Sequence, residues 1–112
     1  MIKKSKINIE ISLDDENVPK SIHWQSSDNP NGVSPQECKA MLLALFDKDH
    51  LDTLKIDLWT KEMQVLEMDR FFYQSLRAMA DTYYRATQNN ELATQMRQFV
   101  QYFGEKTGIL EK

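Results

Sequence analysis

The sequence is poor in the residues on which catalytic, metal and phosphate sites depend. Its 112 residues include one cysteine, two histidines and three glycines. The single Cys38 can form neither an intrachain disulfide nor, by itself, a structural zinc site, which favours a reducing compartment. Three glycines exclude the glycine-rich turns that hold nucleotide phosphates, and the residues around His23 and His50 form no nucleophile elbow or Cys–His signature. We therefore expect a protein that is not an enzyme and has no cofactor.

Excess positive charge and long apolar runs are also absent. Fourteen Lys and Arg oppose seventeen Asp and Glu, so the net charge is -3 and no positive field exists to hold a phosphate backbone. The longest apolar run, Ala40 to Phe46, is far shorter than the roughly 18 residues that span a bilayer, and no signal-peptide core follows the N-terminal lysines. We expect a cytoplasmic protein with no nucleic-acid partner and no direct membrane insertion.

Two periodicities predict most of the secondary structure. Apolar and polar residues alternate over 7–13, 22–25 and 53–60, which predicts three strands. Apolar residues spaced by three and four predict a long helix over 65–86 and a last helix over 92–104. Polar segments rich in turn-forming residues follow the first strand, the second strand and the long helix, at 14–17, 26–32 and 87–90.

A further helix is predicted over 34–46. Ser34 can cap it, Pro35 suits its first position, and Glu37 can complete a capping box. One apolar stripe then follows at helical spacing: Cys38, Met41, Leu42, Leu45 and Phe46. On this stripe we interpret Cys38 as a buried, inert thiol rather than a reactive one.

These elements predict a single α+β domain over residues 1–112 with an ordered core over about 5–104. Their order is strand, strand, helix, strand, helix, helix. We expect a three-stranded, mostly antiparallel sheet with the helices packed on one face. The strand order second–first–third is favoured because every neighbouring pair is then antiparallel, whereas first–second–third needs a right-handed parallel crossover.

The densest polar cluster does not have the spacing of a metal site. Asp47, Asp49, His50 and Asp52 offer oxygen and nitrogen ligands. Counted from Asp47, however, the fifth position of a calcium loop is Leu51 and the sixth, which should be glycine, is Asp52. We interpret this cluster as a solvated turn and expect no metal.

The predicted sheet face away from the helices is the first candidate interaction surface. It is polar and carries one large aromatic side chain, Trp59, and tryptophan is a common binding anchor. The alternative is that Trp59 folds under the loop at 60–64. The candidate residues are Glu10, His23, Gln25, Lys55, Asp57 and Trp59.

The back of the long helix is the second candidate surface. Its residues lie at helical spacing and could join two copies of the chain into a homodimer. Packing against the last helix explains the same spacing. The residues concerned are Leu66, Tyr73, Arg77 and Tyr84.

Three segments carry a resemblance to a known family: Thr53–Met63, Glu67–Tyr73 and Met79–Thr87. They resemble the gliding motility-associated protein GldC family of Bacteroidetes. The likeness also includes Glu16–Pro19, Ile22–Trp24 and Cys38–Met41. Gln64 stands where the resemblance leads us to expect a proline at the start of the long helix.

The resemblance implies a small accessory protein that supports the gliding machinery and its associated secretion apparatus. The family offers no catalytic residues to carry over to this chain. We therefore expect a non-enzymatic protein that binds a protein component of that machinery. The alternative is a small-ligand-binding domain or enzyme with a pocket between sheet and helices, although the positions predicted to point inward are apolar.

Overall fold

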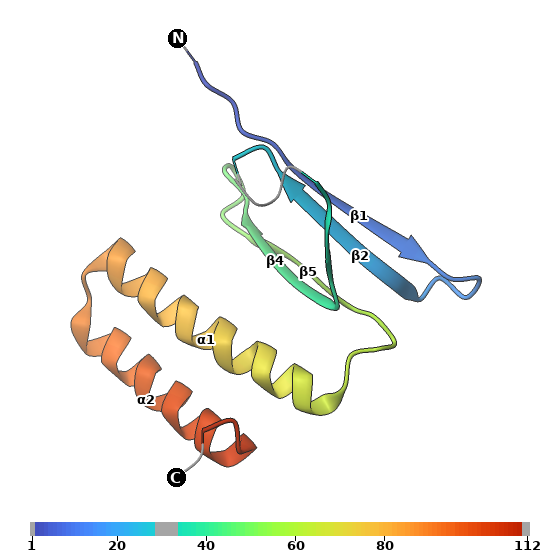
Figure 1. Ribbon diagram of the computed structural model, residues 1–112. Coiled ribbons are helices and arrows are strands. Elements are labelled where there is room, and N and C mark those ends of the chain that lie inside the picture. The colour runs from blue at the N-terminus through green and yellow to red at the C-terminus, as the bar shows by residue number, and fades with distance from the viewer. Residues whose placement is uncertain (1, 29–33, 111–112) are drawn as a thin grey trace. The chain divides into compact units, whose positions relative to one another are not determined.

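The computed structural model describes residues 2–28 and 34–110 and confirms the α+β class. Five strands are followed by two helices (Figure 1): β1 (Ile7–Leu13), β2 (Pro19–Ser26), β3 (Gln36–Cys38), β4 (Ala40–Phe46), β5 (Thr53–Trp59), α1 (Val65–Thr87) and α2 (Asn90–Thr107). Contacts divide the chain into two compact units, one ending at Met63 and the other beginning at Gln64. The first unit holds the strands and the second holds the helices.

The first three strands form an antiparallel sheet in the order β1–β2–β3. Ile11 and Cys38 lie opposite Ile22 on the two neighbouring strands. Ile22 is completely buried, and it is the only large side chain that is fully buried in the described part of the chain. The alternation that predicted the first two strands is therefore confirmed, and Ile22 is the centre of their apolar face.

The helix predicted over 34–46 is wrong, because these residues form β3 and β4. The run Ala40–Phe46 pairs antiparallel with β5 along its whole length, from Ala40 opposite Trp59 to Phe46 opposite Thr53. An unbroken apolar run fits a strand and a helix stripe equally well, and pairing with a distant segment decides between them. The predicted strand order is wrong for the same reason, since β5 lies beside β4 and not beside β1.

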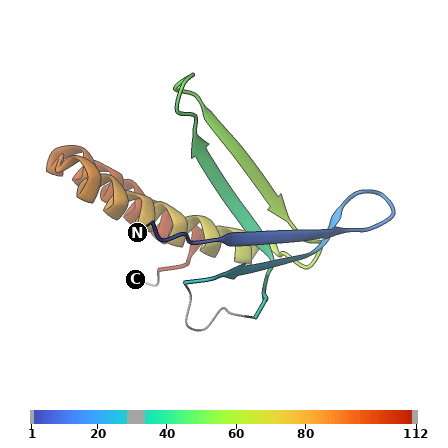
Figure 2. The same ribbon diagram turned by 90° about the horizontal axis from the view of Figure 1, so that it is seen from above.

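The chain passes from one sheet to the other at a single residue, Lys39. β3 ends at Cys38 in the sheet with β2, and β4 begins at Ala40 in the sheet with β5. The backbone N–H of Thr60 donates to the Lys39 carbonyl at 2.8 Å, which closes the β4–β5 hairpin at its base. Figure 2 shows the β4–β5 hairpin leaving the three-stranded sheet.

Both predicted C-terminal helices are present, and their ends are fixed by local hydrogen bonds. Before α1, the Glu67 side chain accepts from the Gln64 backbone N–H at 3.0 Å, as in a capping box. After α1, Gln88 takes a left-handed conformation with φ of 60° and donates to the Tyr84 carbonyl. The Asn89 side chain then accepts from the first turn of α2.

The two helices pack against each other at a glycine of α2. A Cβ atom on Gly104 would lie 2.7 Å from Cε1 of Tyr73 and 2.7 Å from Cδ1 of Leu110. The missing side chain therefore lets the Tyr73 ring of α1 approach the backbone of α2. An ion pair, Arg97 to Asp81 at 3.2 Å, joins the same two helices further along.

Candidate interaction surfaces

One face of the three-stranded sheet is polar. Glu10 lies opposite His23 and Asn8 opposite Gln25 on β1 and β2, while Glu37 of β3 lies opposite His23 on its other side. His23 Nε2 is 4.0 Å from Glu37 Oε1, and the two side chains are 41% and 62% exposed. The structure thus brings three of the sequence-predicted surface residues, Glu10, His23 and Gln25, onto one face.

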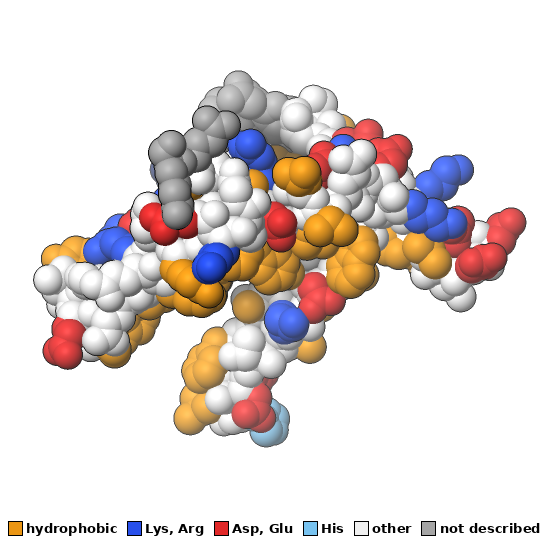
Figure 3. Space-filling model, turned by 90° about the horizontal axis from the view of Figure 1, so that it is seen from below, with side chains coloured by type: hydrophobic (Ala, Val, Ile, Leu, Met, Phe, Trp, Pro, Cys, Tyr) orange, Lys and Arg blue, Asp and Glu red, His pale blue; other side chains and the backbone are white. Residues whose placement is uncertain are grey.

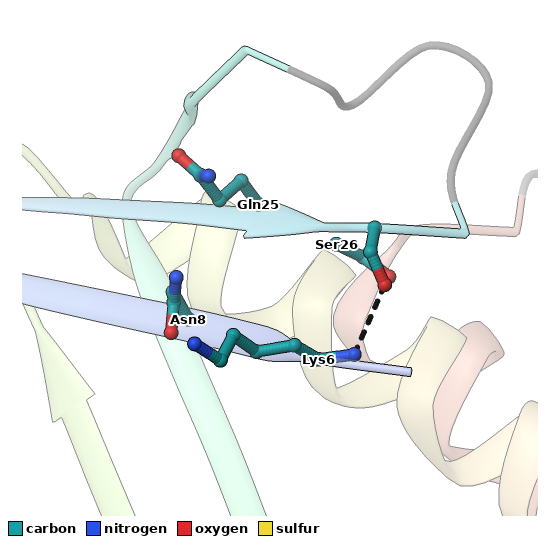
Figure 4. Close-up of a pocket in the computed structure, with 5 residues that line it drawn as sticks. Lys6, Asn8, Gln25 and Ser26 are labelled. Carbon is teal, nitrogen blue, oxygen red and sulfur yellow. Dashed lines mark hydrogen bonds between the residues drawn. The ribbon is translucent and has the colours of Figure 1, made fainter. Parts of the chain in front are cut away.

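A shallow pocket lies at the end of this face (Figure 4). Its volume is about 310 Å³, and its walls come from Lys6, Asn8 and Gln25 together with Ser26 and Ser27. The backbone N–H of Lys6 donates to the Ser27 hydroxyl at 3.0 Å, which holds the rim together. These groups could hydrogen-bond a small polar molecule, but they include no pair of titratable side chains for acid–base chemistry.

The other three predicted surface residues lie on the β4–β5 hairpin. Lys55 and Asp57 are two residues apart on β5 and form an ion pair with Nζ 2.7 Å from Oδ2. Trp59 lies on the same face at the end of the strand and is 53% exposed. The six predicted residues therefore belong to two sheets rather than one, because β5 pairs with β4.

The opposite face of this hairpin is entirely apolar, and sequence reasoning missed it. We call it the hydrophobic hairpin face; its residues are Met41, Leu43, Leu45, Leu54, Ile56 and Leu58. Leu45, Leu54 and Ile56 are 51%, 58% and 37% exposed. Figure 3 shows hydrophobic side chains along one side of the hairpin. The alternation in 53–60 did signal half of this face, but the other half lay in the segment assigned to a helix.

Three of the four residues predicted for self-association on the long helix contact other side chains of the helical unit. Tyr73 is buried, and the Arg77 guanidinium lies 5.6 Å from the centre of its ring. Arg97 of α2 stacks on Tyr84 at the same distance. Leu66, in contrast, is 68% exposed. Packing between the helices thus occupies both tyrosines, and self-association through this face stays a prediction.

Asp14 connects the β1–β2 turn to the segment that follows β5. Its carboxylate accepts from Lys61 Nζ at 2.6 Å and from the backbone N–H groups of Val18 and Glu16 at 3.0 and 2.8 Å. The Lys61 hydrogen bond, helped by the two amides, lowers the pKa of Asp14 to about 2. Asp14 is therefore a structural carboxylate that stays ionised at neutral pH.

The polar cluster at 47–52 forms the turn between β4 and β5. Asp47 Oδ2 accepts from the His50 backbone N–H at 2.7 Å and lies 2.9 Å from His50 Nδ1. These contacts, the backbone one first, lower the pKa of Asp47. Among the described residues, no three His, Cys, Asp or Glu side chains come together in a way that could hold a metal ion.

Cys38 lies on β3, not on a helix, and it is half-buried opposite Ile22. Burial raises the pKa of its thiol. A raised pKa reduces the thiolate fraction at neutral pH, so Cys38 is a weaker nucleophile than an exposed cysteine.

Comparison with known proteins identifies the family. The model of the family described as gliding motility-associated protein GldC-like matches residues 19–109. The chain belongs to this family. The match begins at Pro19, so it covers β2 to β5 and both helices and leaves β1 outside. Neither the curated proteins nor the solved structures give a match.

The family match includes the hydrophobic hairpin face and every predicted surface residue except Glu10. In the described part of the chain, neither α1 nor α2 is both long and apolar enough to cross a membrane.

Proposed function

We propose that this chain is a non-enzymatic accessory protein of gliding motility. It acts in the cytoplasm by binding a protein component of the gliding machinery. Membership of the GldC-like family supports the cellular process. The single observation that carries the binding role is Trp59, a large aromatic side chain that is 53% exposed beside the Lys55–Asp57 ion pair.

The chemistry of this face suits a protein partner. Tryptophan supplies a large apolar area at low entropic cost, and the neighbouring charges can fix the orientation of a partner at the rim of the contact. The partner therefore has an apolar pocket for the indole and complementary charges around it. The alternative is a small-ligand-binding domain or enzyme with a pocket between sheet and helices; the pocket at Lys6, Asn8 and Gln25 lies on the three-stranded sheet instead and could hold a small polar molecule.

The test is quantitative affinity capture from a gliding bacterium that encodes this chain. The wild type is compared with Trp59→Ala and with Phe99→Ala, a control aromatic residue on α2 with a similar exposure of 52%. We expect wild type and Phe99→Ala to enrich the same gliding components. Loss of a central aromatic anchor weakens binding by about 2 kcal/mol, or roughly thirtyfold, so Trp59→Ala should lose them.

The same variants are then used to complement a deletion strain, and spreading of the colony is measured. We expect Phe99→Ala to restore spreading to the wild-type level and Trp59→Ala to fail at equal protein abundance. Equal capture and equal spreading by all three proteins would exclude Trp59 as the binding residue.

A further inference from the structure

The β4–β5 sheet contains two strands in the described part of the chain, which leaves one edge of β5 open. Two-stranded sheets are marginal in water unless further strands or a packed layer support them. This sheet also carries the hydrophobic hairpin face, whose central residue Ile56 is 37% exposed. A strand added at the open edge of β5 would extend both the sheet and that face.

The hydrogen bonds of the hairpin show which backbone groups face the open edge. Asp47 N–H donates to the Asp52 carbonyl at 2.7 Å, and Thr60 N–H donates to the Lys39 carbonyl at 2.8 Å. Both bonds belong to the register in which Leu43 lies opposite Ile56. Because bonded pairs alternate in antiparallel sheets, Ile56 turns its N–H and C=O toward β4. The residues on either side, Lys55 and Asp57, turn theirs outward.

The charges on β5 select one self-pairing register. If a second copy of β5 pairs antiparallel with Ile56 opposite Ile56, then Lys55 of each copy lies opposite Asp57 of the other. A shift of two residues either way places Lys55 opposite Lys55 or Asp57 opposite Asp57. Opposite charges across a strand pair are favourable and like charges are unfavourable. A shift of one residue would put Leu54 and Leu58 on the polar face.

We propose that a second copy of this chain pairs with the open edge of β5 in this register, across a two-fold axis at Ile56. The pairing forms a four-stranded sheet, β4–β5–β5–β4, through about eight new backbone hydrogen bonds. The hydrophobic hairpin faces of the two copies then become one continuous surface. The charges of Lys55 and Asp57 disfavour pairing with other strands and in other registers, and they favour this register, in which opposite charges face each other. Lys55 and Asp57 also lie beside Trp59 in the function proposed above, but the pairing rests on the edge and the register of β5 and does not require that Trp59 binds a gliding component.

Two single charge reversals test the register. Lys55→Glu places a glutamate opposite Asp57, and Asp57→Lys places a lysine opposite Lys55, so each variant alone has only like charges across the axis. We expect the wild type to be a dimer by light scattering and each variant to dimerise at least about tenfold more weakly. The matched control is Lys48→Glu, an equal charge change in the exposed turn outside β5.

Mixing the two variants separates pairing between chains from the ion pair within the strand. In a mixed dimer, the glutamate introduced at position 55 of the first variant faces the lysine introduced at position 57 of the second. The unchanged Asp57 of the first variant faces the unchanged Lys55 of the second. We expect the mixture to recover a one-to-one heterodimer, although the Lys55–Asp57 ion pair within each strand remains broken. Circular dichroism checks that both variants keep the wild-type fold.

Three results would overturn the proposal. They are a monomeric wild type at high protein concentration, a dimer that both single variants retain, and a mixture of folded variants that stays monomeric. A dimer whose affinity does not change in either charge-reversal variant would use another surface, such as the open edge of β4 or the helices.

Discussion

Replacing Thr60 by valine should raise the free energy of unfolding. The Thr60 side chain is 3% exposed, and its hydroxyl oxygen has no hydrogen-bond partner among the described residues. The backbone of the same residue is well paired, because its N–H donates to Lys39 and its carbonyl accepts from Met63. The hydroxyl thus loses its hydration on folding and receives no hydrogen bond in return.

The size of the effect follows from that desolvation. Burying a polar group without a partner costs about 1–3 kcal/mol. Valine has the same branched shape, so the substitution leaves no cavity and keeps the preference for an extended backbone. We expect Thr60→Val to stabilise the protein by about 1–2 kcal/mol, which raises the melting temperature by about 4–8 °C for a chain of this size.

The measurement is thermal and urea unfolding followed by circular dichroism. Thr53→Val, at the exposed start of β5, is the control and should change the free energy of unfolding by less than about 0.5 kcal/mol. A loss of stability in Thr60→Val of about 1 kcal/mol or more would refute the reasoning. It would mean that the hydroxyl has a partner, such as a bound water molecule.

Two further predictions concern the sheet unit. Because Ile22 is completely buried, Ile22→Ala should lower the free energy of unfolding by about 2–5 kcal/mol and Ile22→Val by about 0.5–1.5 kcal/mol. Tryptophan fluorescence during urea unfolding measures both losses. Equal losses in the two variants would contradict the burial of Ile22. Because the pKa of Asp14 is lowered from 3.8 to about 2, its contribution to stability is fully present above pH 3.8 and is lost as the pH falls toward about 2. Lys61→Met should reduce this acid dependence in unfolding curves, and an unchanged dependence would exclude Lys61 as the main cause.

The elements with a clear periodicity could be predicted from the sequence. Alternation located β1 and β5, and spacing by three and four placed α1 within a residue of its bounds. In these segments the apolar residues fit either the two-residue period of a strand or the helical period of about 3.6 residues, but not both. The family resemblance was likewise correct, because it rested on segments of β5 and α1 that the family match includes.

The segment from Gln36 to Phe46 could not be predicted from local signals. Ala40–Phe46 is apolar at every position, so it fits both periods, and the capping residues before it favoured a helix. Its strand structure depends on β5, which begins seven residues after β4 ends. The hydrophobic hairpin face was missed for this reason, because it exists only when β4 and β5 pair.

The one-residue passage at Lys39 limits how this chain can vary in length. Side chains alternate along a strand and β4 is paired with β5 along its whole length, so adding or deleting one residue there would turn the β4–β5 hairpin over relative to β3. The hydrophobic hairpin face and the face that carries Trp59 would then exchange sides relative to β3. An insertion in the exposed turn at 47–52 would leave the passage at Lys39 unchanged and would keep the β4–β5 register as long as the bond from the Asp47 N–H to the Asp52 carbonyl stays closed.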